Sequence, residues 1–184
     1  FKWVNDTMGH GIGDELLRCV GARLNETVGG AGIVARLGGD EFAVLAPVVD
    51  GDAAISQLGD RIVERLAQPF DLDGQWVDVA GSVGVAFAPD DANEPSDLTR
   101  RADLALYRAK REGGGLCRFF EREMDESAQA RHSLEQDLRL AVARQDFEVY
   151  YQPQVDPASG VFKGAEALVR WTHPTRGAVS PVEF

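Results

Sequence analysis

Long apolar runs are missing from the sequence. No stretch approaches the about 20 consecutive apolar residues that a helix needs to cross a bilayer, and no secretory signal precedes the first polar segment. We therefore expect a cytoplasmic location and no membrane contact from these residues; a parent protein anchored through a region ahead of Phe1 is compatible with this. An initiator Met is also missing and residues 181–184 form no closing element, so we expect the chain to be a fragment.

Cysteine and positive charge are both scarce. Cys19 and Cys117 are the two cysteines, they lack the spacing of a metal site, and in apolar surroundings they are expected to be buried, free thiols in a reducing compartment. Lys and Arg number 19 against 30 Asp and Glu, which gives a net charge of −11. An acidic surface repels phosphate backbones and anionic lipids, so nucleic acid is not an expected partner.

The first two thirds of the chain alternate between helical and strand-like patterns. Hydrophobic residues make up 44% of the sequence and charged residues 27%, as in a globular protein. Residues 1–12 predict a loop, and apolar spacing predicts helices at about 14–28, 54–66 and 96–109. Strands are predicted on both sides of Gly38-Gly39, after a turn at 71–74, and at 82–87 and 116–120. This order predicts an α+β fold with a ferredoxin-like, palm-type antiparallel sheet covered by helices, to which a strand ahead of Phe1 would add.

The remaining third changes character. Residues 121–145 are rich in charge with a sparse helical stripe, which predicts a charged linker helix. Residues 147–152 alternate as a strand, 157–160 predict a turn, and a second strand lies within 161–171. A hairpin of this kind cannot bury its own apolar face, so it is expected to open a second, larger domain. The predicted domains are therefore 1–120, a linker at 121–145, and 146–184.

Residues 36–42 read Arg-Leu-Gly-Gly-Asp-Glu-Phe, between two apolar runs. Glycines suit a tight hairpin turn and leave the backbone open to close approach by another molecule. The adjacent acids Asp40 and Glu41 have the oxygen ligands that a divalent cation prefers. The alternative is an ordinary solvated turn, in which Gly, Asp and Glu are common.

Three further residues have both a chemical and a structural interpretation. Asn5 and Asp14 offer an amide and a carboxylate, which suit the donor and acceptor pattern of a guanine edge; alternatively Asn5 shapes a turn and Asp14 caps a helix. Lys110 could meet a phosphate, with help from Arg108 or Arg111, or could complement the dipole at a helix C-terminus.

Taken together, the motifs are more specific than any one alone. Phe-Lys-x-x-Asn-Asp-x-x-Gly-His-x-x-Gly-Asp-x-Leu, Arg-Leu-Gly-Gly-Asp-Glu-Phe, Ser-Val-Gly-Val-Ala at 82–86 and Ala-Asp-x-Ala-Leu-Tyr-x-Ala-Lys at 102–110 occur in that order. Over about residues 1–120 the chain resembles the GGDEF family of diguanylate cyclases. Tyr-Gln-Pro-Gln-Val at 151–155 and Glu-Ala-Leu-Val-Arg-Trp at 166–171 resemble the start of the EAL family of cyclic di-GMP phosphodiesterases, from about Arg131 onward.

The GGDEF resemblance implies a cyclase that condenses two GTP molecules into cyclic di-GMP and pyrophosphate. Each subunit would hold one GTP, so a homodimer would form the active site, with Mg²⁺ (or Mn²⁺) as cofactor. By this resemblance, Asn5 and Asp14 recognise the guanine, and the backbone at Gly38 and Gly39 lies against the phosphates. Asp40 binds the metal, and Glu41 is an assisting acid near the metals. Lys2 and Lys110 contact the triphosphate.

The sequence departs from the family pattern in three places. A further metal-binding aspartate, four residues ahead of the position of Phe1 in the family, is not in this chain. Gly29 and Gly32 stand where many members carry an inhibitory Arg-x-x-Asp product site, so product inhibition through that site is expected to be absent. Gly114 stands where a basic residue often follows the last helix, so weaker phosphate binding is expected.

The EAL resemblance implies that Glu166 is the first Mg²⁺ ligand and that Gln152 and Arg170 contact cyclic di-GMP. A (β/α)₈ barrel needs about 250 residues and about fifty are present, so this chain alone is not expected to hydrolyse cyclic di-GMP. The chain alone is also expected to lack cyclase activity. An alternative function is that the GGDEF part is a GTP-binding regulatory module that controls an EAL phosphodiesterase.

Overall fold

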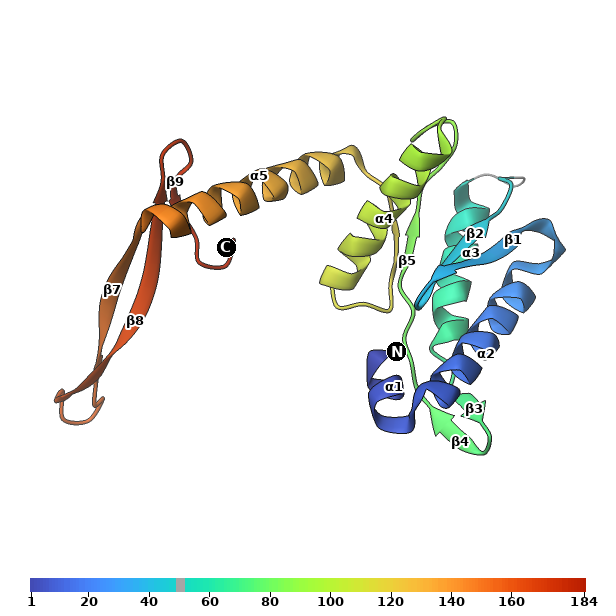
Figure 1. The fold of residues 1–184 in the computed structure, drawn as a ribbon, viewed down its shortest axis with the longest axis horizontal. Coiled ribbons are helices and arrows are strands. Elements are labelled where there is room, and N and C mark those ends of the chain that lie inside the picture. The colour runs from blue at the N-terminus through green and yellow to red at the C-terminus, as the bar shows by residue number, and fades with distance from the viewer. Residues whose placement is uncertain (49–51) are drawn as a thin grey trace. The chain divides into compact units, whose positions relative to one another are not determined.

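The computed structural model describes residues 1–48 and 52–184 (Figure 1). The chain divides into two compact units, Phe1–Asp125 and Glu126–Phe184. Among the residues that the structure describes, no helix is both long enough and apolar enough to cross a membrane.

The helices of the first unit begin earlier than the sequence predicts. They are α1 (Lys2–Met8), α2 (His10–Val28), α3 (Asp52–Leu66) and α4 (Pro95–Arg111), with a 3₁₀ turn at Gly29–Ala31. The predicted loop at 1–12 is therefore wrong. Val4, 1% exposed, anchors α1 in the core, and Gly9 with φ of 87° separates the two helices, because glycine adopts such a φ without strain.

The strands of the first unit form three separate pairs. They are β1 (Ile33–Gly38) with β2 (Glu41–Leu45), β3 (Phe70–Leu72) with β4 (Gln75–Val77), and β5 (Val83–Val85) with β6 (Cys117–Phe119). The α+β class is confirmed. The expectation of a purely antiparallel arrangement is wrong for β5 and β6, which pair in parallel, since α4 forms a crossover between them.

The hairpin of β3 and β4 corrects the predicted turn at 71–74. Only Asp73 and Gly74 form the turn; their φ values of 53° and 83° are the positive values that suit a two-residue hairpin. Asp71 Oδ1 accepts a hydrogen bond from the Gly74 N–H at 2.8 Å. Phe70 and Leu72, 1% and 0% exposed, belong to the core.

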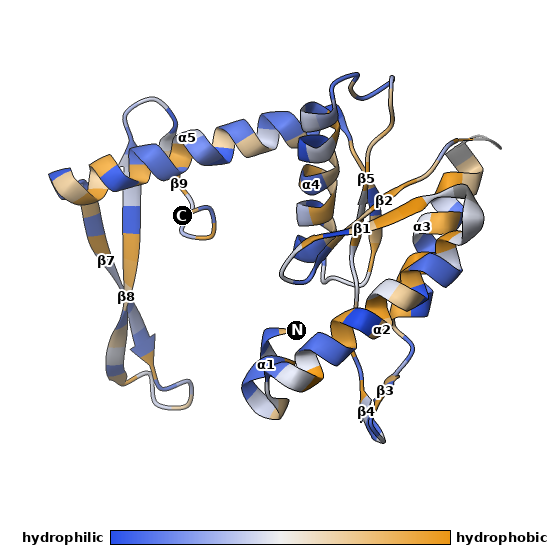
Figure 2. Ribbon diagram, turned by 45° about the vertical axis from the view of Figure 1, so that its right-hand side comes forward, coloured by the Kyte–Doolittle hydropathy of each residue, from blue (hydrophilic) through white to orange (hydrophobic). Residues whose placement is uncertain are grey.

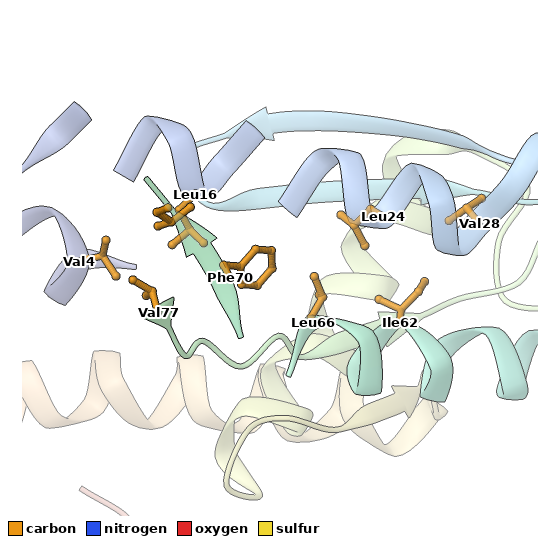
Figure 3. Close-up of a cluster of buried hydrophobic side chains, with 9 residues drawn as sticks. Val4, Leu16, Leu24, Val28, Ile62, Leu66, Phe70 and Val77 are labelled. Carbon is orange, nitrogen blue, oxygen red and sulfur yellow. The ribbon is translucent and has the colours of Figure 1, made fainter. Parts of the chain in front are cut away.

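One apolar core joins α1, α2 and α3 to the two hairpins of the first unit. Figure 3 shows side chains of α1 and α2 facing Phe70, Leu66 and Ile62. Arg23 of α2 reinforces this contact: its guanidinium lies 3.5 Å from the centroid of the Phe70 ring and donates to the carbonyls of Arg65, Gln68 and Pro69. Arg65 lies in the last turn of α3, and Gln68 and Pro69 follow that helix, so Arg23 ties the end of α3 to α2.

Both cysteines are free, as predicted, but they are only partly buried. Burial raises the pKa of the Cys117 thiol, and the nearby Asp60 adds to this shift. Burial and the neighbouring Glu15 likewise raise the pKa of Cys19. Both shifts favour the unreactive thiol form.

The charged helix predicted at 121–145 is α5 (Arg122–Arg144), and its surface is mainly hydrophilic (Figure 2). Its first turn belongs to the first unit. There, Met124 packs in a cluster with Ala105 and Phe120, and Asp125 forms ion pairs with Arg100 and Arg101.

The second unit contains the rest of α5 and a three-stranded antiparallel sheet. The strands are β7 (Phe147–Val155), β8 (Phe162–His173) and β9 (Gly177–Val179), in that order. The predicted hairpin is confirmed, and the described residues form no closed barrel. Trp171, 2% exposed, packs with Leu134, Ala141 and Val179, so the apolar stripe of α5 covers one end of the sheet.

His173 fixes the turn between β8 and β9. Its Nδ1 accepts hydrogen bonds from the N–H groups of Thr175 and Arg176, both at 3.1 Å. A neutral imidazole that accepts at Nδ1 carries its proton on Nε2, which lies 3.2 Å from Asp137 Oδ2 of α5. The histidine thus links the helix to the sheet within the second unit.

Candidate functional site

The tip of the β1–β2 hairpin is open to solvent. Gly39 has φ of 52°, and a Cβ added at Gly38 or Gly39 would meet nothing within 4 Å. Asp40 and Glu41 are exposed beside them. The motif therefore leaves a bare backbone and two adjacent carboxylates accessible to a ligand.

Arg36 holds this tip from strand β1. Its Nε and Nη2 groups donate to the Gly39 carbonyl at 3.0 and 2.8 Å. Arg36 belongs to the hairpin motif, but the motif alone predicts no role for it. The signal in the sequence is its spacing, because an arginine three residues ahead of a glycine in a turn is within reach of that glycine's carbonyl.

Asn5 lies directly over Gly13. A Cβ on Gly13 would be 1.9 Å from Asn5 Oδ1 and 3.0 Å from Asn5 Cγ. Gly13 precedes Asp14, so the structure brings the predicted guanine-binding amide of α1 beside the segment of α2 that carries the predicted carboxylate. The alternative in which Asp14 caps a helix is excluded, because α2 begins at His10 with Gly9 as its N-cap and Asp14 lies exposed within the helix.

A surface depression connects α2 with the hairpin. Its volume is about 460 Å³, and it is lined by Asp14, Leu17, Arg18 and Arg36. One lining residue is thus a predicted guanine contact, and another is bound to the hairpin tip. Arg18 forms an ion pair with Glu15, so its charge is partly neutralised at the edge of the depression.

The predicted triphosphate contacts lie on two other helices. Lys2 is exposed in α1, and Lys110 is exposed in the last turn of α4. Arg108, considered as an additional phosphate contact, is instead paired with Glu112 at 2.9 Å and with Glu121 at 2.5 Å. Hydrogen bonds from Arg108, and to a smaller extent from Arg118, lower the pKa of the Glu112 carboxyl. The positive charge of Arg108 is therefore already paired with carboxylates of its own chain.

The predicted metal ligands of the first unit are Asp40 and Glu41. Across residues 1–48 and 52–184, no three His, Cys, Asp or Glu side chains converge as a metal site. Two adjacent carboxylates still fit Mg²⁺, which proteins often bind through one or two carboxylates while substrate phosphates and water complete the shell.

The two glycines at the position of the inhibitory product site have structural reasons to be glycine. Gly29 ends α2 with φ of 69°, where an L side chain is strained. A Cβ on Gly32 would lie 2.5 Å from Val28 Cγ1 and 3.0 Å from the Leu45 carbonyl oxygen. The backbone conformation at Gly29 and the packing at Gly32 therefore disfavour an Arg and an Asp at these positions.

In the second unit, the predicted EAL residues share one face of the β7–β8 pair. Gln152 lies directly opposite Glu166, and Arg170 lies opposite Glu148. Because side chains alternate along a strand, Glu166 and Arg170, four residues apart, point to the same side. The Arg170 guanidinium lies 5.9 Å from the centroid of the Tyr150 ring, which helps to orient it on this face.

The comparison with protein families agrees with the motif geometry. The family profile described as diguanylate cyclase, GGDEF domain, matches residues 1–115. The chain belongs to the GGDEF family. An EAL domain profile matches residues 135–184, so the chain is a GGDEF domain followed by the beginning of an EAL domain.

Known GGDEF proteins resemble this chain in sequence and structure. It is 40% identical to the bifunctional diguanylate cyclase/cyclic di-GMP phosphodiesterase MucR and 38% identical to the cyclic di-GMP phosphodiesterase NbdA, both from Pseudomonas aeruginosa. The whole of this chain aligns with each of them, and the aligned part is 27% of the length of MucR and 23% of the length of NbdA. The GGDEF domain of YfiN from the same organism aligns with a TM-score of 0.65 and 35% identity, over 70% of this chain and 75% of that one. The GGDEF domain and its relatives indicate a role in cyclic di-GMP signalling.

Proposed function

We propose that the GGDEF unit is one half of a diguanylate cyclase active site, which binds one GTP per subunit and acts as a homodimer. The observation that carries the proposal is the depression lined by both Asp14 and Arg36. It places a guanine-compatible carboxylate in the same depression as the arginine that binds the hairpin tip. Asn5, packed on Gly13, supplies the amide that complements this carboxylate.

The proposed roles of the chain's own residues follow from their chemistry. Asn5 and Asp14 bind the guanine edge, which offers N–H donors beside a carbonyl acceptor. The bare backbone at Gly38 and Gly39 lies against the phosphates, and Lys2 and Lys110 balance the triphosphate charge. Two nucleotides held in facing subunits are then oriented for attack of one 3′-hydroxyl on the other α-phosphate, with pyrophosphate as the leaving group.

Asp40 and Glu41 are proposed to hold Mg²⁺ (or Mn²⁺) at the tip. Their exposed position leaves room for the nucleotide's phosphates to share the ion. When bound there, the cation would neutralise phosphate charge and favour ionisation of the attacking hydroxyl. Glu41 assists as an acid beside the metal.

We propose that the parent protein also hydrolyses cyclic di-GMP through its EAL domain, with Glu166 as a metal ligand and Gln152 and Arg170 as ligand contacts. The common face of these three residues supports this role. The chain spans about a quarter of the length of the curated relatives MucR and NbdA, so the activity belongs to the longer protein. The 38% identity to NbdA, a phosphodiesterase, also favours a second candidate, in which GTP bound to the GGDEF unit activates hydrolysis.

One experiment distinguishes the two candidates. Full-length protein is incubated with Mg²⁺ across a range of GTP concentrations, and both synthesis and hydrolysis of cyclic di-GMP are measured. The cyclase proposal expects synthesis that saturates with GTP. Undetectable synthesis together with GTP-accelerated hydrolysis would instead establish the regulatory function.

Replacing Gly13 with alanine is expected to weaken GTP binding about tenfold, because the added methyl displaces the Asn5 amide. Stability should change by less than about 1 kcal/mol, since the end of the Asn5 side chain can move and alanine favours helices. Titration with a non-hydrolysable GTP analogue measures the affinity. Gly11→Ala is the matched control, because a Cβ there meets nothing within 4 Å in the same helix. Equal affinity of both variants would exclude the proposed guanine contact by Asn5.

Cyclic di-GMP is expected not to inhibit synthesis through the site beside the hairpin, because Gly29 and Gly32 replace the inhibitory residues. Initial rates at saturating GTP, measured with a Glu166→Gln variant that cannot remove the product, should not change when cyclic di-GMP is added. A saturable fall in the initial rate under these conditions would show that a product site operates without the Arg-x-x-Asp pair.

A further inference from the structure

Among the residues that the structure describes, Arg36 is the one whose side chain is hydrogen-bonded to the tip of the GGDEF hairpin. Two of its N–H groups reach a single acceptor, the Gly39 carbonyl, at 3.0 and 2.8 Å. Guanidinium is a planar fork with fixed N–H directions, so this pair of bonds restrains both the distance and the orientation of the turn. Gly39 is also the residue with positive φ in the turn.

Little else restrains the tip. The strand pairing shifts between Arg36, which faces Phe42, and Gly38, which faces Glu41. One residue of β1, Leu37, is therefore left over, and it is 60% exposed. Such a bulge bends the strand and redirects the residues beyond it. Apart from the adjacent residues of the chain, no atoms lie within 4 Å of the positions that a Cβ would take at Gly38 and Gly39. Packing therefore does not fix the direction in which the tip points.

Arg36 also reaches the other part of the proposed nucleotide site. It lines the depression shared with Asp14 and Leu17. Two of its five N–H groups are used by the Gly39 carbonyl, and the Gly39 oxygen, which would repel a phosphate, is covered by a cation. Arg36 thus restrains the turn and also places a positive charge at the edge of the depression.

We propose that Arg36 is a positioning residue that fixes the Gly39–Asp40 turn before nucleotide binds and so orients Asp40 for its role in the reaction. This inference rests on the proposed cyclase function for its catalytic consequence, but the restraint on the turn is independent of activity. Lysine cannot replace the arginine, because an ammonium group is a point charge without a planar fork.

The first test measures hydrogen exchange in nucleotide-free, full-length protein, in the peptide that covers residues 36–45. In Arg36→Ala and Arg36→Lys, exchange at the tip is expected to rise about tenfold, because the bonds that oppose local opening are lost. Arg122→Ala, which removes the same charge from exposed α5, should match the wild type. Unchanged exchange in both Arg36 variants would overturn the proposal, whether or not the protein is a cyclase.

The second test separates positioning from direct nucleotide contact. Arg36→Ala is expected to lower kcat for cyclic di-GMP synthesis about tenfold or more while KM for GTP stays within about twofold. Added guanidinium should restore part of kcat in Arg36→Ala. A higher KM with unchanged kcat would assign Arg36 to nucleotide binding and overturn the positioning role. A third outcome would separate the two proposals. If the wild-type protein makes no cyclic di-GMP but hydrogen exchange at the hairpin tip still depends on Arg36, the cyclase proposal fails and the positioning of the turn by Arg36 stands.

Discussion

Full-length protein with Asp40→Ala is expected to synthesise cyclic di-GMP at least about a hundredfold more slowly than the wild type. A metal that stabilises the transferring phosphoryl group is worth several kcal/mol of transition-state stabilisation, and Asp40 is the proposed metal ligand at the open hairpin tip. Product formation from GTP and Mg²⁺ measures the effect. The rate should fall mainly through kcat, with smaller loss of GTP affinity.

The control for this variant is Asp90→Ala. Asp90 is also an exposed carboxylate, in the loop after β5, so its removal changes the net charge by the same amount without touching the hairpin. It should leave synthesis at the wild-type rate. If Asp40→Ala and Asp90→Ala have the same activity, Asp40 does not bind the catalytic metal.

Replacing Gly84 with alanine is expected to destabilise the first unit by about 3 kcal/mol. A Cβ on Gly84 of β5 would lie 2.1 Å from the Ala102 carbonyl oxygen and 2.3 Å from the Leu106 nitrogen. Both are backbone atoms of α4, so relief requires the whole helix to move away from the strand. Because α4 also carries Lys110, the movement would displace a proposed triphosphate contact.

Urea unfolding measures this effect as a lower midpoint with an unchanged slope. Gly30→Ala is the matched control: it adds the same methyl where no atom lies within 4 Å and should change stability by less than about 0.5 kcal/mol. Equal midpoints for Gly84→Ala and wild type would mean that β5 and α4 are not in close contact.

Much of the fold was predictable because the informative residues lie at element boundaries. Gly38-Gly39 between apolar runs predicts the β1–β2 hairpin, and the glycines after Lys110 predict the end of α4. By contrast, α1 has seven residues and a single buried one, Val4, which is too short for helical periodicity to emerge. The pair β5–β6 has three residues per strand, and such short runs do not reveal whether their pairing is parallel.

The candidate site was predictable as a set of residue types but not as a set of contacts. The motif spacing identifies Asn5, Asp14 and the hairpin acids. It does not reveal that Asn5 packs on Gly13 or that Arg36 binds the Gly39 carbonyl, because both contacts depend on the path of the backbone. Arg108 is an example of the opposite error. Its position in the sequence suggests a phosphate contact, but its guanidinium donates a hydrogen bond to Glu121, which is thirteen residues away.

The most direct test of the proposed cyclase is product analysis of full-length protein carrying Glu166→Gln, so that cyclic di-GMP is not destroyed as it forms. With GTP and Mg²⁺, we predict that cyclic di-GMP and pyrophosphate accumulate, with two GTP consumed for each cyclic di-GMP, and that chelation of the metal stops the reaction. Absence of cyclic di-GMP, while the same protein binds GTP, would contradict the account.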